Sequence, residues 1–203
     1  SFTRNNPDET VSQAIAASNA GDYDLHLALH SNDAGEANAG QVRGTDVYYY
    51  PGSTRGKRAA DIIAENFKNI YPDPSRVRTV PTTTLAEVVR TRAPSVLVEI
   101  AYHDNVQDAE WIRDNIQPIA RNLVQSLTQY FGIPFIEAQP AREGRVDTVR
   151  GNLNLRSRPS LDAPIITTIP DGSPVIVYGQ WQEWYVVEYM GNIGYASSRY
   201  IEV

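Results

Sequence analysis

The sequence predicts an α/β fold in which helices cover both faces of a sheet, followed by a small all-β barrel. Residues 96–101 are apolar apart from one glutamate, a pattern typical of a strand buried on both faces. Predicted strands and helices alternate over the first 131 residues, which favours a three-layer arrangement with a mostly parallel sheet. After residue 145 the pattern changes to short strands separated by Gly, Pro, Asn and Asp turns, as in a small barrel.

The composition is that of an ordinary globular protein. The chain has 203 residues, of which 41% are apolar and 21% charged, enough for one or two domains. No apolar run approaches the roughly 18 residues that a membrane span requires, and no cysteine is present to form a disulfide. The net charge of −6 disfavours nucleic-acid binding, because phosphate neutralisation requires clustered Lys and Arg.

The first elements follow from local signals. The segment Phe2–Arg4 is expected to end a strand. A helix is expected over residues 8–20, because Asp8 or Thr10 can cap its start and Gly21 can end it. Three further elements are expected in order: a strand around residues 25–30, a Gly- and Asn-rich loop over 33–45, and a strand over 47–50 that ends at a Pro-Gly turn.

The strand around residues 25–30 carries two histidines, His26 and His30. Three leucines alternate with the other residues here, which is the strand period. At roughly 3.3 Å per residue, two histidines four positions apart stand about 13 Å apart along the strand. At most one of them is therefore expected to bind a metal. His30 is preferred because it adjoins the polar exit Ser31–Asn32, whereas His26 is interpreted as a packed or surface side chain.

The later elements of the first domain are a helix, a strand and further helices. Apolar residues at helical spacing predict an amphipathic helix over 56–70, which the Tyr71-Pro72 pair ends. A short helix is expected over 84–89, before the apolar strand. One or two helices follow over 106–131, and Pro118 should kink or restart them.

Glu99 is the strongest candidate catalytic residue. It lies within an apolar run, and burying a lone carboxylate is costly unless it is paired or has a function. Perturbed carboxylates of this kind serve as general bases. The alternative is that Glu99 merely sits at the exposed end of its strand.

An ordered set of motifs resembles the zinc-dependent N-acetylmuramoyl-L-alanine amidases of the Amidase_3 type. The segment 27–32 resembles the "SIHxN" strand of that family, and residues 93–99 with Asn105 resemble its "PAVLVExGFxSN" strand and turn. Weaker matches occur in the same order at Thr3-Arg4 with Asp8 ("TRxxD"), Ser18-Asn19 ("AN"), Val47–Tyr50 ("EVYY") and Val89-Arg90 ("VLR"). The resemblance covers about residues 2–132 and is specific as a set.

The resemblance implies an amidase-like domain that binds Zn²⁺ and hydrolyses peptidoglycan outside the cell. It implies His30 as a metal ligand and Glu99 as the catalytic base, with Asn32, Arg90 and Asn105 binding substrate or supporting the site. Asn32 or Asp24 is expected to orient His30. The other two zinc ligands of the family lie upstream of "TRxxD", and this sequence starts directly before that motif. A separate N-terminal fragment that completes the site is therefore a possible partner, and His103 is a weaker substitute.

The domain boundaries are expected at 1–136 for the amidase-like domain, 137–144 for a polar linker and 145–203 for the barrel. Residues 153–160, 169–172, 184–187 and 194–201 together resemble the bacterial SH3 domain. This resemblance implies a docking module on the cell wall. Trp181, Tyr178 and Tyr189 are candidate wall-binding aromatics, whereas Trp184 and Tyr195 are expected in the barrel core.

Two functions compete at this point. The first is a secreted, wall-associated amidase that uses zinc-activated water. The second is a non-catalytic wall-binding or partner module with an incomplete metal site, because a single imidazole cannot hold a catalytic zinc.

Overall fold

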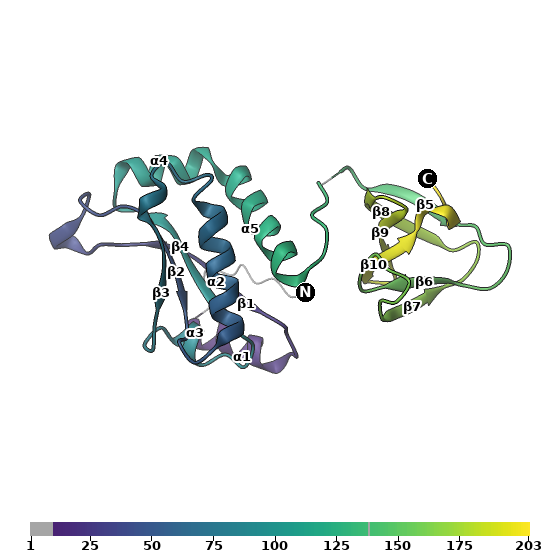
Figure 1. Ribbon diagram of the computed structural model, residues 1–203, viewed down its shortest axis with the longest axis horizontal. Helices are drawn as coiled ribbons and strands as arrows, with labels where there is room; N and C mark the ends of the chain where they lie inside the picture. Colours follow the sequence, from purple (N-terminus) through teal and green to yellow (C-terminus); the bar gives the residue numbers. More distant parts are fainter. Residues whose placement is uncertain (1–9, 138) are drawn as a thin grey trace. The chain divides into compact units, whose positions relative to one another are not determined.

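The computed structural model describes residues 10–137 and 139–203, which form two compact units (Figure 1). The first unit spans Ser1–Phe131 and the second spans Gly132–Val203, and each has its own hydrophobic core. The expected strand end at Phe2–Arg4 and the candidate cap Asp8 lie outside the described residues. The two units match the predicted fold class, since the first mixes helices and sheet and the second is almost entirely β.

The first unit is built on a four-stranded sheet with the strand order β1-β4-β2-β3. The strand β1 pairs with β4 in parallel, β2 pairs with β3 in parallel, and β2 runs antiparallel to β4. The sheet is thus mostly parallel, as expected, with one antiparallel pairing at its centre. Its strands are β1 (His26–Asn32), β2 (Thr45–Tyr49), β3 (Val77–Pro81) and β4 (Ser95–Tyr102).

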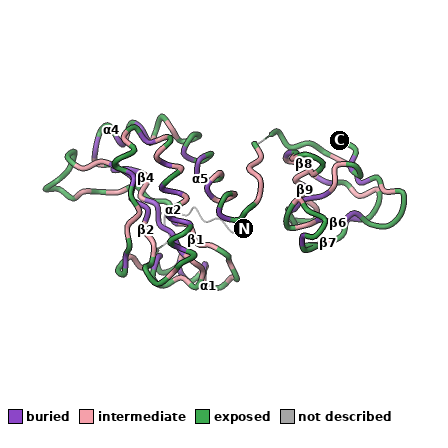
Figure 2. Tube along the Cα trace, viewed as in Figure 1, coloured by how far each residue is buried: buried purple, intermediate pink, exposed green. Residues whose placement is uncertain are grey.

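Helices cover both faces of this sheet. One face packs Val47, Val96 and Val98 against α2, α4 and α5, and this interface is the main core of the unit. The opposite face packs Ala28 and Leu97 against α3, which in turn contacts α1. The buried segments in Figure 2 follow β2 and β4, the two central strands. The helices are α1 (Val11–Ala20), α2 (Thr54–Phe67), α3 (Ala86–Val89), α4 (Val106–Asp114) and α5 (Ile116–Phe131).

Two helix boundaries confirm local sequence signals. The hydroxyl of Thr10 accepts a hydrogen bond from the Gln13 backbone N–H, and the Gln13 side chain accepts one from the Thr10 backbone N–H in return, so this capping box starts α1. Between α4 and α5 the helix breaks at Asn115. Pro118 therefore lies in the first turn of α5, where its missing N–H costs no helical hydrogen bond.

The strand β3 was not predicted from the sequence. It lies at the edge of the sheet and pairs only with β2 within the part of the chain that the structure describes. Its residues mix valine with arginine, threonine and proline, because only part of an edge strand is buried. Arg78 lies within this strand, and its side chain is largely exposed.

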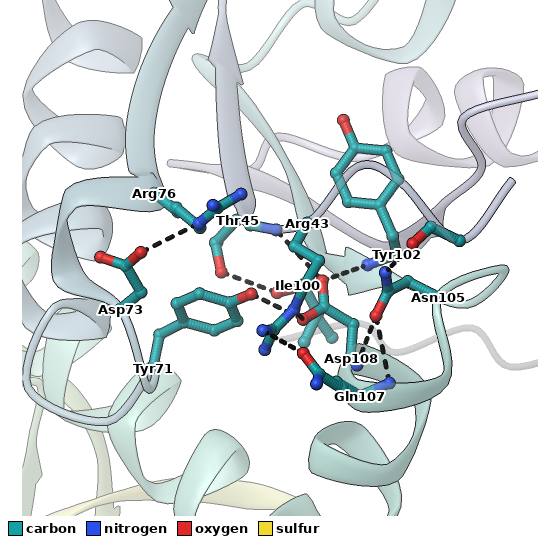
Figure 3. A network of polar contacts seen from close by, with 12 residues as sticks. Arg43, Thr45, Tyr71, Asp73, Arg76, Ile100, Tyr102, Asn105, Gln107 and Asp108 are labelled. Carbon is teal, nitrogen blue, oxygen red and sulfur yellow. Dashed lines mark hydrogen bonds and ion pairs between the residues drawn. The ribbon is translucent and has the colours of Figure 1, made fainter. Parts of the chain in front are cut away.

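Asp108 on α4 ties together the segments that flank the strands β2 and β4 (Figure 3). Its carboxylate is completely buried. One oxygen accepts hydrogen bonds from the Gly44 and Tyr102 backbone N–H groups, at 3.1 Å each. The other accepts from the Tyr71 hydroxyl at 2.6 Å and the Arg43 guanidinium at 3.0 Å. This network fixes the start of β2 against the end of β4, which places the residues between these points in register.

The second unit is a seven-stranded antiparallel sheet with the order β11-β5-β8-β9-β10-β6-β7. Its core gathers Leu155, Ile169, Val177 and Val187. The first strand, β5, begins at Arg142, inside the segment expected to be a linker. The strands are β5 (Arg142–Val146), β6 (Leu153–Arg156), β7 (Ile165–Ile169), β8 (Pro174–Trp181), β9 (Trp184–Tyr189), β10 (Asn192–Ser197) and β11 (Ile201–Glu202).

Across the described ranges, none of the helices combines the length and the apolar character needed to cross a membrane.

Candidate functional site

Four ionisable residues form a row across the sheet of the first unit, one from each strand. The pairing places His30 of β1 opposite Glu99 of β4, Glu99 opposite Asp46 of β2, and Asp46 opposite Arg78 of β3. Register partners point to the same face of a sheet, and neighbouring strands lie about 4.8 Å apart. The row is therefore continuous, and it brings together the two strongest candidates from the sequence, His30 and Glu99.

Glu99 has the electrostatic character of a general base. Partial burial is the main cause that raises the pKa of its carboxyl, and the neighbouring Asp46 adds to the effect, while His30 and His103 oppose it. Its Oε2 atom is buried without a hydrogen-bond partner among the described residues. A buried oxygen left unpaired is costly, and such groups concentrate at functional sites.

Asp46 holds the guanidinium of Arg78 in place. The carboxylate is nearly fully buried and accepts two hydrogen bonds from Arg78, at 3.0 Å from Nε and 3.1 Å from Nη2. The Arg78 side chain remains 61% exposed. Its other N–H groups can therefore meet an anionic group that approaches the row.

Glu87 on α3 lies directly against His30, and the sequence analysis missed it. The Nε2 atom of His30 lies 3.0 Å from Oε2 of Glu87. The Nε2 atom of His26 lies 3.4 Å from the other oxygen without hydrogen-bond geometry, while Nδ1 of His26 lies 3.0 Å from the Ser18 hydroxyl. The sequence offered a weak signal at most, a carboxylate beside Leu85 and Val88 in a short helix. His26 is packed, as expected.

The proximity of His26 and the hydrogen bond from His30 lower the pKa of Glu87 to about 2, and together they outweigh the effect of burial. In return, the hydrogen bond to Glu87 is the main cause that raises the pKa of His30. The carboxylate is consequently ionised at neutral pH and can only accept hydrogen bonds.

The three residues predicted to bind substrate or support the site lie outside the row of ionisable residues. Asn105 caps α4 by accepting from the Gln107 and Asp108 N–H groups, and its amide nitrogen donates to the Gly40 carbonyl. Arg90 is exposed just after α3, and its carbonyl accepts from the Asn19 side chain. Asn32 follows His30 on β1, and its side-chain oxygen accepts from the Asp33 N–H.

Asp24 and His103, which were expected to support the metal site, make other contacts in the structure. The Asp24 carboxylate, an expected partner of His30, lies 3.9 Å from the Arg55 guanidinium. The partner that the structure gives His30 is Glu87. His103 contacts Ser31 at 3.2 Å and Asp33 at 3.3 Å, so its ring is engaged with the loop after β1.

His30 could supply one ligand of a zinc site. Imidazole is a common zinc ligand, and the unpaired Oε2 of Glu99 lies in the same row as His30. Within residues 10–137 and 139–203, however, no group of three or more His, Cys, Asp or Glu side chains converges to hold a metal.

The second unit contains a groove of about 430 Å³. Trp184, Tyr200 and Leu161 contribute its apolar lining, Arg150 and Arg156 contribute positive charge, and none of the described lining residues is acidic. Trp184 was expected in the core, but it is only half-buried and faces this groove. Tyr195 is buried as expected. The candidate aromatics Trp181, Tyr178 and Tyr189 are half-buried elsewhere, and the Tyr178 hydroxyl donates to Glu188.

Comparison with known proteins gives a match for each unit. The N-acetylmuramoyl-L-alanine amidase family model matches residues 1–129, and the bacterial SH3 domain model matches residues 151–202. No curated protein matches the chain.

Solved structures resemble the first unit. The catalytic domain of the CD27L endolysin targeting Clostridia difficile is 25% identical with a TM-score of 0.51, over 58% of this chain and 61% of that one. The catalytic domain of CwlV, an N-acetylmuramoyl-L-alanine amidase from Bacillus (Paenibacillus) polymyxa var. colistinus, is 19% identical with a TM-score of 0.52, over 62% and 68%. An N-acetylmuramoyl-L-alanine amidase from Clostridium difficile 630 is 16% identical with a TM-score of 0.54, over 61% and 66%. The chain thus spans less than two thirds of the CD27L domain.

Proposed function

Because this chain belongs to the N-acetylmuramoyl-L-alanine amidase family and continues into a bacterial SH3 domain, we propose that it cleaves the amide between N-acetylmuramic acid and L-alanine in peptidoglycan. The observation that carries this proposal is the pairing of His30 with Glu99 across β1 and β4. An imidazole and a carboxylate with a raised pKa on one sheet face are suited to amide hydrolysis.

Glu99 acts as the general base in this proposal. Its ionised carboxylate takes a proton from the attacking water as the oxygen bonds to the amide carbon. The same proton then passes to the leaving nitrogen of L-alanine when the C–N bond breaks, so Glu99 returns to its ionised form. A raised pKa suits the first step, because it makes the ionised carboxylate a stronger base toward the water.

His30 is the residue of this chain that would hold a zinc ion, together with ligands outside the described residues. When bound, zinc polarises the amide carbonyl and makes water acidic enough to ionise near pH 7. Asn32 and Asn105 would support the loops that follow β1 and β4, while Arg90 and Arg78 offer positive charge to the carboxylates of a stem peptide.

The second unit would hold the enzyme on the cell wall. Its groove joins a half-buried aromatic side chain, Trp184, to two arginines, which suits a ligand with apolar and anionic groups. Trp181, Tyr178 and Tyr189 remain candidate contacts outside the groove. Tethering raises the local concentration of the substrate without any new contact in the catalytic unit. The proposed location is therefore extracellular, at the wall.

A second function is a non-catalytic wall-binding or partner module. The observation that favours it is that no three metal donors converge within the part of the chain that the structure describes. Zinc stoichiometry separates the two functions, because a catalytic zinc takes about three protein ligands.

The test is hydrolysis of a soluble muropeptide by the purified protein, with the products identified by mass. We expect a peptide with a free L-alanine amino group, no product after chelation, and recovery on adding zinc. Cleavage at another bond, or no cleavage in zinc-loaded protein, would contradict the proposed function.

A further inference from the structure

The Glu87 carboxylate is enclosed between two imidazoles on one face of the sheet. Only 8% of the residue is exposed. Its Oε2 atom contacts Nε2 of His30 at 3.0 Å, and its Oε1 atom lies 3.4 Å from Nε2 of His26. Each oxygen of the carboxylate therefore faces a different histidine.

The fold holds Glu87 firmly in this position. Its backbone carbonyl accepts hydrogen bonds from the Ser95 hydroxyl at 3.0 Å and the Thr91 hydroxyl at 2.9 Å. The next residue, Val88, is buried against Ala28 and Leu97 on the sheet. These contacts fix the helix α3 over β1 and β4, so the carboxylate has little freedom to leave His30.

This contact determines which nitrogen of His30 carries the proton. A neutral imidazole has one N–H donor and one acceptor nitrogen. An ionised carboxylate cannot donate, so Nε2 must be the protonated nitrogen and Nδ1 keeps its lone pair. A metal-binding histidine usually donates its other N–H to a carboxylate or carbonyl, which fixes the orientation of the ring.

We propose that Glu87 is a positioning residue that fixes His30 with Nε2 protonated and Nδ1 available to a zinc ion. The role as zinc ligand rests on the proposed function, whereas the tautomer of His30 does not. The inference also gives His26 a role: held by Ser18 at 3.0 Å, it packs against the far oxygen of Glu87 and limits the movement of the carboxylate.

The first test uses the metal-free 203-residue chain, which contains only three histidines. Nitrogen–proton correlation spectra of the imidazole rings, recorded at a pH where all three are neutral, report each tautomer. We expect the Nε2-protonated form of His30 in the wild type. In Glu87→Ala, His30 should shift toward a mixture of tautomers, while the matched control Glu110→Ala, an exposed carboxylate on α4, should not change it. An Nδ1-protonated His30 in the wild type, or an unchanged tautomer in Glu87→Ala, would overturn the inference.

The second test measures zinc binding by competition with a chelator. We expect Glu87→Ala to raise the zinc dissociation constant about 10–100-fold, and Glu87→Gln, which keeps a carbonyl acceptor, to change it much less. Equal affinity of Glu87→Ala and wild type would contradict a positioning role. Loss of zinc in Glu87→Gln as complete as in His30→Ala would make Glu87 itself a ligand and also overturn the inference. If the wild type binds no zinc, the proposed metal site fails, and the tautomer measurement alone decides the role of Glu87.

Discussion

Asp46 on β2 is the register partner of Glu99 on β4, so two carboxylates face the same side of the sheet on neighbouring strands. The negative charge of Asp46 helps to raise the pKa of Glu99, and Asp46 also holds Arg78 by two hydrogen bonds. A buried residue with no recognisable motif around it thus helps to set the pKa of the carboxylate proposed as base.

Replacing Asp46 should shift the pH dependence of hydrolysis. The base must be ionised, so activity rises as the pH passes through the pKa of Glu99, which is raised above its ordinary value. Asp46→Asn removes a negative charge that raises this pKa and leaves Arg78 unneutralised, and both changes favour the ionised form. We expect the acidic limb of the kcat/KM profile to move to lower pH. A limb that moves to higher pH would contradict the assignment of Glu99 as base.

The contact between Glu87 and the two histidines should stabilise the metal-free fold over a limited pH range. The pKa of Glu87 is lowered to about 2, so its contribution is present above its ordinary value near 4.5 and is lost as the pH falls toward 2. The pKa of His30 is raised above 6.5, so the contribution is lost as the pH rises through that raised value. We expect Glu87→Gln to lower the free energy of unfolding by about 2 kcal/mol between roughly pH 4.5 and 6.5, measured by urea unfolding. A cost that is the same at every pH would contradict this account.

Asp108 should be essential to the stability of the first unit and should not affect the stability of the second. Replacing it with Ala leaves two backbone N–H groups, the Tyr71 hydroxyl and the Arg43 guanidinium without their common acceptor. We expect the free energy of unfolding of this unit to fall by about 3–5 kcal/mol. Unfolding is followed by the signal of Trp111, which packs in the core of this unit. The unfolding midpoint reported by the resonances of the second unit should stay at its wild-type value, because that unit has a separate core. The neighbouring exposed Glu110→Ala is the control, and an equal loss in both variants would contradict the role of the network.

Wall binding should depend on the groove of the second unit. We expect Trp184→Ala to reduce cosedimentation with purified cell walls more than Trp181→Ala, because Trp184 lines the groove and Trp181, its cross-strand partner, does not. Both variants should hydrolyse a soluble muropeptide at the wild-type rate. If Trp181→Ala has the larger effect, the wall contact lies outside the groove.

Much of the fold and the two central residues of the candidate site could be predicted from the sequence. The alternating leucines around His30 and the apolar run around Glu99 are local patterns, and both form strands where expected. The Thr10 cap and the restart of the helix at Pro118 are equally local, and they are confirmed.

The remainder of the row depends on pairing between distant segments. Asp46 and Arg78 meet Glu99 only because β2 lies between β4 and β3, and no local pattern specifies that strand order. The edge strand β3 lacks a continuous apolar run, so no local pattern predicts it. Glu87 was missed for a related reason: its partners are 57 and 61 positions away, at His30 and His26.

The most direct test of the central claim compares the wild type with Glu99→Gln in the zinc-loaded protein. Release of L-alanine amino termini from peptidoglycan and bound zinc are measured on the same samples. The account predicts a fall in turnover of at least about 10²-fold with zinc content unchanged, because Glu99 moves the proton and does not hold the metal. Turnover close to that of the wild type, or loss of zinc from the variant, would contradict it.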